Sequence, residues 1–152
     1  MARFRYRLAT LLRLKESARD EKRAQLAEAY RAAEILVERL REVDDELAVT
    51  RTQAQQLAQA GKIDIDYMLN SHRYERVLRA QRNMIEQQQQ QIAAEVERRR
   101  LALVEADRQV RVLEKLREKK LHEHLQREDR RDQKLMDELA ARATSKLGEV
   151  TS

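Results

Sequence analysis

The sequence is nearly free of residues that end helices or form turns. It contains no proline and two glycines, and Gly61 is the only glycine before Gly148. A compact α/β or all-β domain needs turn residues about every ten positions, so this composition excludes both classes. The chain is rich in Ala, Leu, Glu, Arg and Gln, which are strong helix formers. We therefore expect long helices.

Apolar residues in the first half of the chain recur at alternating spacings of three and four residues. This heptad pattern is typical of a coiled-coil seam and predicts a first helix over about residues 5–60. Upstream, the pattern continues with a slip through Leu8, Leu11, Leu14 and Ala18. The predicted seam consists of Leu26, Ala29, Ala33, Leu36, Leu40, Val43, Leu47, Thr50, Ala54 and Leu57.

A single turn is predicted at Gly61, because glycine is favoured just past the end of a helix. Asp64 and Asp66 are candidate N-caps of a second helix. We expect the turn over about residues 61–66, the second helix over about 66–146 and a frayed tail over 147–152.

The second helix also carries an apolar seam, in which the step from Gln88 through Ile92 to Val96 is interpreted as a stutter. Ion pairs at i, i+4 are expected to support this helix. The pairs are Glu75 with Arg79, Glu95 with Arg99, Asp107 with Arg111, and Glu123 with Arg127. The predicted seam consists of Ser71, Tyr74, Leu78, Gln81, Ile85, Gln88, Ile92, Val96, Arg99, Leu103, Ala106, Val110 and Leu113.

Two helices joined by so short a turn must run antiparallel, with residue n opposite roughly residue 127 − n. This register places Phe4 near Glu123 and leaves about 20 residues at the end of the second helix without a partner. The predicted fold class is all-α. Residues 1–152 form a single domain in which two long helices make an antiparallel coiled-coil hairpin.

The formal net charge of +5 originates at the N-terminal end, where residues 1–23 carry eight basic and three acidic side chains. Such an end is suited to an acidic protein surface or to anionic lipid. The sequence contains no signal peptide and no membrane-spanning segment, since its longest aliphatic run is Leu101–Val104. Together with the absence of cysteine, this indicates a cytoplasmic protein.

Residues for catalysis or metal binding form no recognisable pattern. The chain lacks cysteine, a glycine-rich phosphate loop and a nucleophile elbow. His122 and His124 would point about 200° apart on a helix and could not chelate one ion. We expect no catalytic, cofactor-binding or metal-binding residues, and no enzymatic activity. Tyr67 and Tyr74 share a helix face near the turn, where they either pack in the seam or anchor a partner.

Both ends of the sequence resemble a known family. Residues 4–16 (FRYRLATLLRLKE) resemble the opening of the FliJ family of flagellar type III export proteins. Residues 113–120 (LEKLREKK) and 133–140 (QKLMDELA) resemble the second signature of that family. In the predicted register, the motifs at residues 4–16 and 113–120 lie at the same end of the hairpin.

The resemblance implies a non-enzymatic, cytoplasmic component of the flagellar export apparatus, held peripherally at the inner membrane by that apparatus. It implies a coiled-coil stalk that inserts into and stimulates the hexameric export ATPase FliI and couples it to the export gate protein FlhA. A chaperone or escort role, with contacts to export chaperones, is also implied, without nucleic-acid binding or direct membrane insertion. The candidate ATPase contacts are Phe4, Tyr6, Leu8, Leu11, Leu113, Leu116, Arg117, Asp137 and Glu138, and the candidate gate contacts are Tyr67, Tyr74 and Leu78.

Two alternatives remain open. A stalk protein of a virulence type III secretion system would share the hairpin. A basic coiled-coil module that binds nucleic acid belongs to a different class, and its affinity would fall steeply with salt concentration.

Overall fold

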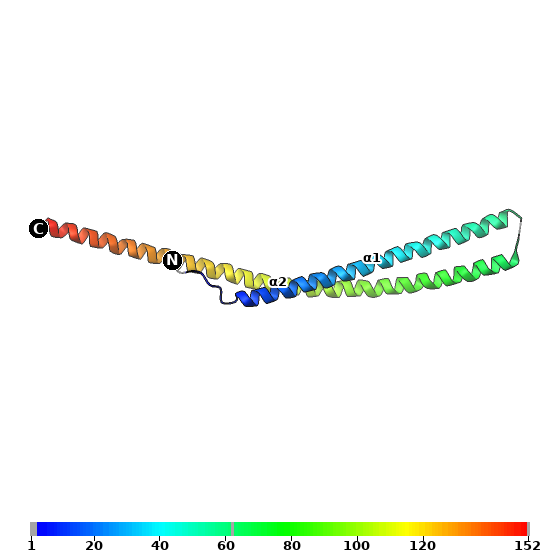
Figure 1. Cartoon of the computed structure of the whole chain (residues 1–152), viewed down its shortest axis with the longest axis horizontal. Helices are drawn as coiled ribbons and strands as arrows, with labels where there is room; N and C mark the ends of the chain where they lie inside the picture. Colours follow the sequence, from blue (N-terminus) through cyan, green and yellow to red (C-terminus); the bar gives the residue numbers. More distant parts are fainter. Residues whose placement is uncertain (1–2, 62, 152) are drawn as a thin grey trace. The chain divides into compact units, whose positions relative to one another are not determined.

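The computed structural model describes residues 3–61 and 63–151 of the chain. It contains two helices, α1 over Ala9–Gln59 and α2 over Ile65–Val150, and no strand lies among the described residues. Figure 1 shows α1 running toward the segment that connects the helices and α2 running back from it. The prediction of an all-α antiparallel hairpin is confirmed.

The contacts divide the described chain into two units. One contains residues 3–19 and 106–151, and the other contains residues 20–105. Each unit holds a piece of α1 and a piece of α2, so each has its own stretch of helix–helix seam.

The connection between the helices follows the rules for helix caps. Gly61 has a φ of 73°, in the left-handed region that favours glycine after the end of a helix. One carboxylate oxygen of Asp64 accepts hydrogen bonds from the backbone N–H groups of Asp66, at 3.1 Å, and Tyr67, at 3.4 Å. Asp64 is therefore the N-cap of α2, and Asp66 lies in its first turn. Lys62, within the predicted turn, lies outside the described residues.

Helix α1 begins at Ala9, later than the predicted start near residue 5. Residues 3–6 are not helical, and the backbone N–H of Ala9 bonds to the carbonyl of Tyr6 at 3.2 Å. On a helix, Phe4 and Tyr6 would point about 200° apart. In an extended segment, alternate side chains lie on the same side, which allows both rings to contact α2.

Helix α2 continues to Val150, so the frayed tail predicted over residues 147–152 is instead helical through residue 150. Gly148 does not end the helix, because a glycine costs only about 1 kcal/mol relative to alanine and no proline follows it. Every residue from 129 to 151 is exposed, in agreement with a predicted end that has no partner helix. Ser152 lies outside the described residues.

The buried core is narrow. Within the described residues, six apolar side chains are buried: Leu12, Ala29, Leu47, Leu78, Ile85 and Val110. The seam predicted for α1 is largely confirmed, because its members from Leu26 to Ala54 are buried or half-buried and Leu57 alone is exposed. A seam of this kind is stabilised by apolar burial along one stripe of each helix rather than in a globular interior.

The seam of α2 differs from the prediction. Gln81 and Gln88 are exposed, and Arg82 and Gln89 occupy the half-buried positions beside them. Tyr74 is exposed as well, and Glu75 is half-buried in its place. With these three residues the spacing alternates between four and three without interruption, so the predicted stutter is wrong. Arg82 fits in the seam because its aliphatic stem covers apolar surface while its guanidinium reaches a carboxylate of α1.

The N-terminal part of α1 also departs from the predicted seam. Its half-buried or buried positions continue the regular heptad spacing upstream, so the predicted slip is wrong. Long basic side chains fill several of these positions, and the leucines of the predicted stripe lie outside the seam. The seam residues are Leu12, Lys15, Arg19 and Lys22, and the exposed ones are Leu8, Leu11, Leu14 and Ala18.

Contacts between the helices confirm the predicted register within residues 20–105. The register places residue 28 opposite residue 99, and a carboxylate oxygen of Glu28 lies 3.8 Å from a guanidinium nitrogen of Arg99. It places residue 44 opposite residue 83, and Asp44 pairs with Arg82 at 2.7 Å. The predicted pairing is therefore correct to within one residue at both points.

All four predicted i, i+4 ion pairs are present on α2. The N–O distances are 2.6 Å for Glu75–Arg79, 2.6 Å for Glu95–Arg99, 2.9 Å for Asp107–Arg111 and 3.8 Å for Glu123–Arg127. Pairs of this kind each stabilise a helix by only about 0.2–0.5 kcal/mol, so they support the helix without determining its partner.

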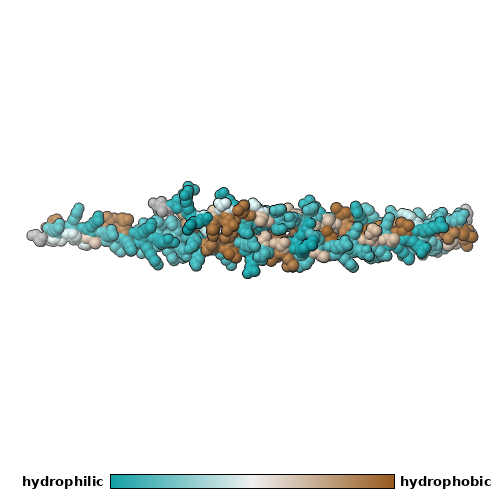
Figure 2. Space-filling view, turned by 90° about the horizontal axis from the view of Figure 1, so that it is seen from below, coloured by the Kyte–Doolittle hydropathy of each residue, from teal (hydrophilic) through white to brown (hydrophobic). Residues whose placement is uncertain are grey.

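The molecular surface is mostly polar. In the face shown in Figure 2, hydrophobic residues form separate patches among hydrophilic ones. None of the described helical segments combines the length and the hydropathy needed to cross a bilayer.

Candidate protein-interaction site

The segment before α1 has two chemically different sides. Phe4 and Tyr6 are half-buried, whereas Arg3, Arg5 and Arg7 are exposed. Residues 3–6 lie in neither a helix nor a strand, and this alternating burial is the pattern in which successive side chains point to opposite sides. The aromatic side therefore faces protein, and the basic side faces solvent.

Both aromatic rings contact α2. The hydroxyl of Tyr6 donates a hydrogen bond of 2.9 Å to the backbone carbonyl of Leu113. The ring of Phe4 lies against the imidazole of His124, with ring centroids 5.6 Å apart and planes tilted by 47°. These two contacts hold the N-terminal segment on the region of α2 that contains the second sequence motif.

An open groove of about 680 Å³ lies beside these rings. Its apolar lining comes from Phe4, Tyr6, Leu8 and Leu116, and its basic lining comes from Arg5, Arg7, Lys120, His124 and Arg127. No carboxylate lines this groove. Glu123 nevertheless lies nearby, since it pairs with Lys120 at 3.1 Å, and the hydrogen bond from Lys120 lowers the pKa of the Glu123 carboxyl.

A second groove lies on the other side of the same segment. Its lining includes Arg3, Arg13 and Arg117 together with the buried Leu12, and Glu16 is its single acidic residue. We call the surface made by both grooves the terminal surface. It consists of residues 3–9 with Leu12, Arg13, Glu16, Leu113, Leu116, Arg117, Lys120, His124 and Arg127.

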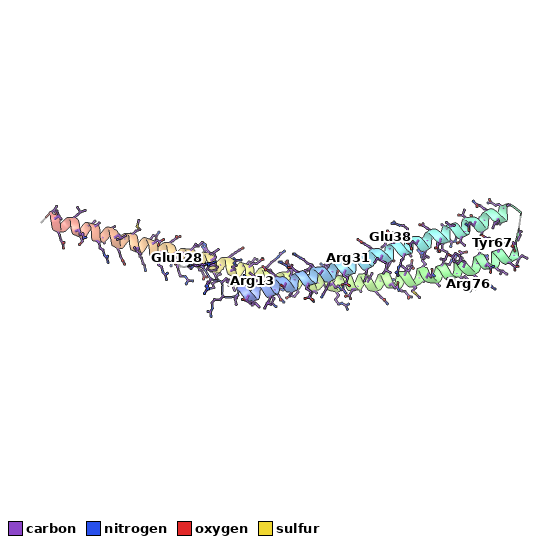
Figure 3. All side chains as sticks on the ribbon, in the orientation of Figure 1. Arg13, Arg31, Glu38, Tyr67, Arg76 and Glu128 are labelled. Carbon is purple, nitrogen blue, oxygen red and sulfur yellow. The ribbon has the colours of Figure 1, made fainter. Side chains whose placement is uncertain are left out.

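Ion pairing of arginines differs between the two units. Within the described part of the chain, eight of the twelve arginines of the first unit have no carboxylate within 4.0 Å: Arg3, Arg5, Arg7, Arg13, Arg108, Arg117, Arg130 and Arg142. In residues 20–105, by contrast, eight of the twelve arginines have such partners: Arg23, Arg41, Arg51, Arg79, Arg82, Arg98, Arg99 and Arg100. Figure 3 labels the unpaired Arg13 near the start of α1. The terminal surface therefore carries positive charge that the protein itself does not neutralise.

Most of the predicted ATPase contacts lie together on the terminal surface: Phe4, Tyr6, Leu8, Leu113, Leu116 and Arg117. Leu11 is exposed on the first turns of α1. Asp137 and Glu138 are exposed in the part of α2 that has no partner helix. They follow Arg117 by about 20 residues, or about 30 Å along the helix, so the structure does not bring them to the terminal surface.

The predicted gate contacts do not form one surface. Tyr67 is exposed in the first turns of α2, beside a groove that Leu57, Ile63 and Met68 also line (Figure 3). Tyr74 is exposed outside the seam, and its hydroxyl donates to Glu46 at 2.8 Å. Leu78 is only 2% exposed and belongs to the core, so it has no surface to offer a partner.

Several residues of the terminal surface are absent from the sequence-based prediction, among them Arg3, Arg5, Arg7, Lys120, His124 and Arg127. The alternation of arginine and aromatic residues over positions 3–7 is the signal for the first three, because period-two alternation indicates a segment that is not helical. The other three lie about one, two and three turns beyond Leu116 on α2, and the antiparallel register points to them.

No group of three or more His, Asp or Glu side chains that could hold a metal ion occurs in residues 3–61 and 63–151. His122 bonds to the side chain of Gln126 at 2.9 Å, and His124 contacts Phe4.

The fold and the terminal surface define a two-helix coiled-coil protein with a basic and apolar surface beside the start of α1. A family model described as "Flagellar FliJ protein" matches residues 4–149. The chain belongs to the FliJ family, which makes it a protein related to flagellar export. No curated protein and no solved structure matches the chain.

Proposed function

We propose that the protein is a stalk that inserts its terminal surface into the hexameric export ATPase FliI and stimulates ATP hydrolysis. The observation that carries the proposal is the meeting of both end motifs in one unit, through the Tyr6–Leu113 hydrogen bond and the Phe4–His124 contact. The end of a stalk that enters the ATPase ring must present residues from both chain segments on one surface. The unpaired arginines supply charge for an acidic partner surface.

Exposed leucines beside the terminal surface provide the apolar part of this interface. Leu8 and Leu11 are more than a third exposed, and the two leucines of α2, Leu113 and Leu116, are half-buried behind the N-terminal segment. In protein–protein interfaces, a few apolar anchor residues surrounded by polar or charged ones commonly supply most of the binding energy. Asp137 and Glu138 belong to a second contact, further along α2, in this proposal.

The test is the ATPase rate of the purified hexamer with and without the protein. We expect the wild type to raise the ATPase rate. Leu8→Asp or Leu11→Asp should bind the ATPase about tenfold more weakly, because each places a charge in an apolar contact. About tenfold more of either variant should therefore be needed for the same stimulation. Val49→Asp, a substitution of an exposed apolar residue in the other unit, is the control and should stimulate as the wild type does. Absence of stimulation by the wild type would contradict the stalk function.

We further propose that the turn region contacts the cytosolic part of the export gate protein FlhA. Tyr67 and the exposed Ile63, Met68 and Leu69 beside it form an apolar surface at this end of the second unit. Exposed groups of apolar side chains commonly mark protein interaction sites. Tyr67→Ala should reduce capture by the gate domain, and Tyr30→Ala, another exposed tyrosine, should not. Equal effects of the two substitutions would exclude Tyr67 from the interface.

In this proposal the protein works in the cytoplasm and reaches the inner membrane through the export apparatus. The family match favours the flagellar system over a virulence secretion system. Addition of the ATPase from each system in parallel distinguishes them, since only the cognate hexamer should be stimulated. An escort role towards export chaperones is compatible with the same exposed helix faces, and chaperone pull-down with the full chain tests it.

A further inference from the structure

The terminal surface combines uncompensated positive charge with exposed aliphatic side chains. Arg3, Arg5 and Arg7 project from the outer side of the N-terminal segment and have no ion-pair partner among the described residues. Leu8, Leu11 and Leu14 follow on the first turns of α1, and Leu14 is 64% exposed. Clusters of cations near exposed apolar side chains are the combination by which peripheral proteins bind anionic bilayers.

The aromatic residues of this surface are already engaged within the protein. The Phe4 ring lies on His124, and the Tyr6 hydroxyl is bonded to the carbonyl of Leu113. Binding to single-stranded nucleic acid without sequence preference depends largely on aromatic rings that are free to stack with bases. The leucine stripe, in turn, has no role in binding phosphate. A bilayer uses both available groups, because its headgroups bind the arginines and its acyl boundary accepts the leucines.

We propose that residues 3–14 bind directly to the surface of an anionic phospholipid bilayer. The arginines contact lipid phosphates, while Leu11 and Leu14 enter the boundary between headgroups and acyl chains. This contact is peripheral and requires no membrane-spanning segment. The argument for lipid binding does not require the proposed ATPase function. Because Leu8 and Leu11 belong to both proposed contacts, lipid and ATPase would compete for the protein.

The test is co-sedimentation of the full-length protein with vesicles. Vesicles of phosphatidylglycerol and phosphatidylcholine should bind the protein, and vesicles of phosphatidylcholine alone should not. Arg5→Gln/Arg7→Gln should lower the partition coefficient by about 30-fold, because each cation near an anionic surface contributes several-fold to binding. Arg31→Gln/Arg39→Gln removes the same charge from exposed positions in the other unit and should change binding little.

A second pair of variants tests the apolar part. Leu14→Gln should weaken vesicle binding severalfold, and Val49→Gln, which is similarly exposed, should leave it unchanged. Circular dichroism of each variant verifies that it remains helical. Equal binding to both kinds of vesicle would overturn the proposal, as would equal losses in the arginine and control variants. Displacement from the vesicles by a stoichiometric oligonucleotide would instead identify nucleic acid as the ligand. None of these outcomes depends on the ATPase.

Discussion

Arg99 shows how one polar residue can be accommodated in an apolar seam. It is half-buried, and its guanidinium donates to the backbone carbonyl of Gln25 on α1 at 2.6 Å and to Glu95 on its own helix at 2.6 Å. The carboxylate of Glu28 lies 3.8 Å away. A seam arginine with partners on both helices favours one alignment of the helices, because a shift would leave the guanidinium without them.

Arg99→Ala should lower the free energy of unfolding by about 2 kcal/mol, the usual cost of losing charged hydrogen bonds from a half-buried site. Arg98→Ala is the matched control. Arg98 also pairs with Glu95, but its side chain is 76% exposed, so we expect a loss below about 0.5 kcal/mol. Urea unfolding followed by circular dichroism measures both. Similar losses for the two variants would show that Arg99 has no special role in the seam.

Glu75 links the helices at a second point. It pairs with Arg51 of α1 at 3.0 Å and with Arg79 at 2.6 Å. The hydrogen bond from Arg51, with the positive charge of both arginines, lowers the pKa of the Glu75 carboxyl below its ordinary value of 4.5. A carboxyl whose pKa is lowered by folding stabilises the fold above its unfolded pKa, and this stabilisation is lost as the pH falls through the folded pKa.

Glu75→Gln should therefore lower the thermal unfolding midpoint at pH 7, and the difference from the wild type should vanish by about pH 2. The measurement is thermal unfolding followed by circular dichroism across this pH range. Glu42→Gln, at an exposed position outside the seam, should change the midpoint little at either pH. A difference for Glu75→Gln that is independent of pH would contradict the assignment to its ionised form.

At the scale of elements, the two helices have different relations to the rest of the molecule. Helix α1 contacts α2 along a seam that includes basic residues in its N-terminal part, which displaces Leu11 and Leu14 onto the surface. Helix α2 is longer, at 86 residues against 51, and its residues 129–150 are all exposed. This last part of α2 gains no stability from tertiary packing.

A chain that ends after residue 128 should therefore unfold at nearly the same temperature as the full chain. It loses only exposed residues, which bury no apolar surface between the helices. Its helical circular-dichroism signal should fall by the share of residues removed. Thermal unfolding of both proteins checks this expectation. A markedly lower midpoint for the shorter chain would mean that residues 129–150 pack against something in solution, such as a second copy.

At the scale of the whole molecule, the antiparallel register is the property on which the composite terminal surface depends. The chain has no cysteine, so introduced pairs can report on this register without interference. Asp44 and Arg82 lie in contact at 2.7 Å, whereas Glu97 lies about 15 residues, or about 22 Å, beyond Arg82 along α2.

A short bismaleimide should join the cysteines of Asp44→Cys/Arg82→Cys within one chain. The same reagent should not join those of Asp44→Cys/Glu97→Cys. The yield should not depend on protein concentration, because the contact is intramolecular. Denaturing gel electrophoresis and mass spectrometry measure the product. Efficient joining in the second pair, or products of double mass in the first, would contradict the register.

Sequence alone was sufficient for the fold class, the place of the turn and the register. These depend on local properties, namely the absence of proline, the single interior glycine and the heptad spacing, and each acts through short-range backbone preferences. The same local rules predicted the four ion pairs of α2 and the seam of α1 beyond Leu26.

Tertiary structure decided which side chains at equivalent spacing face the seam and which face solvent. Lys15, Arg82 and Gln89 take seam positions, while Leu14 and Gln88 do not, because long side chains can bury their stems and keep their polar ends in solvent. It also decided that residues 3–6 are not helical. Only contact with α2 places Phe4 and Tyr6 on one side and leaves Arg5 between them exposed, and no local preference specifies that contact.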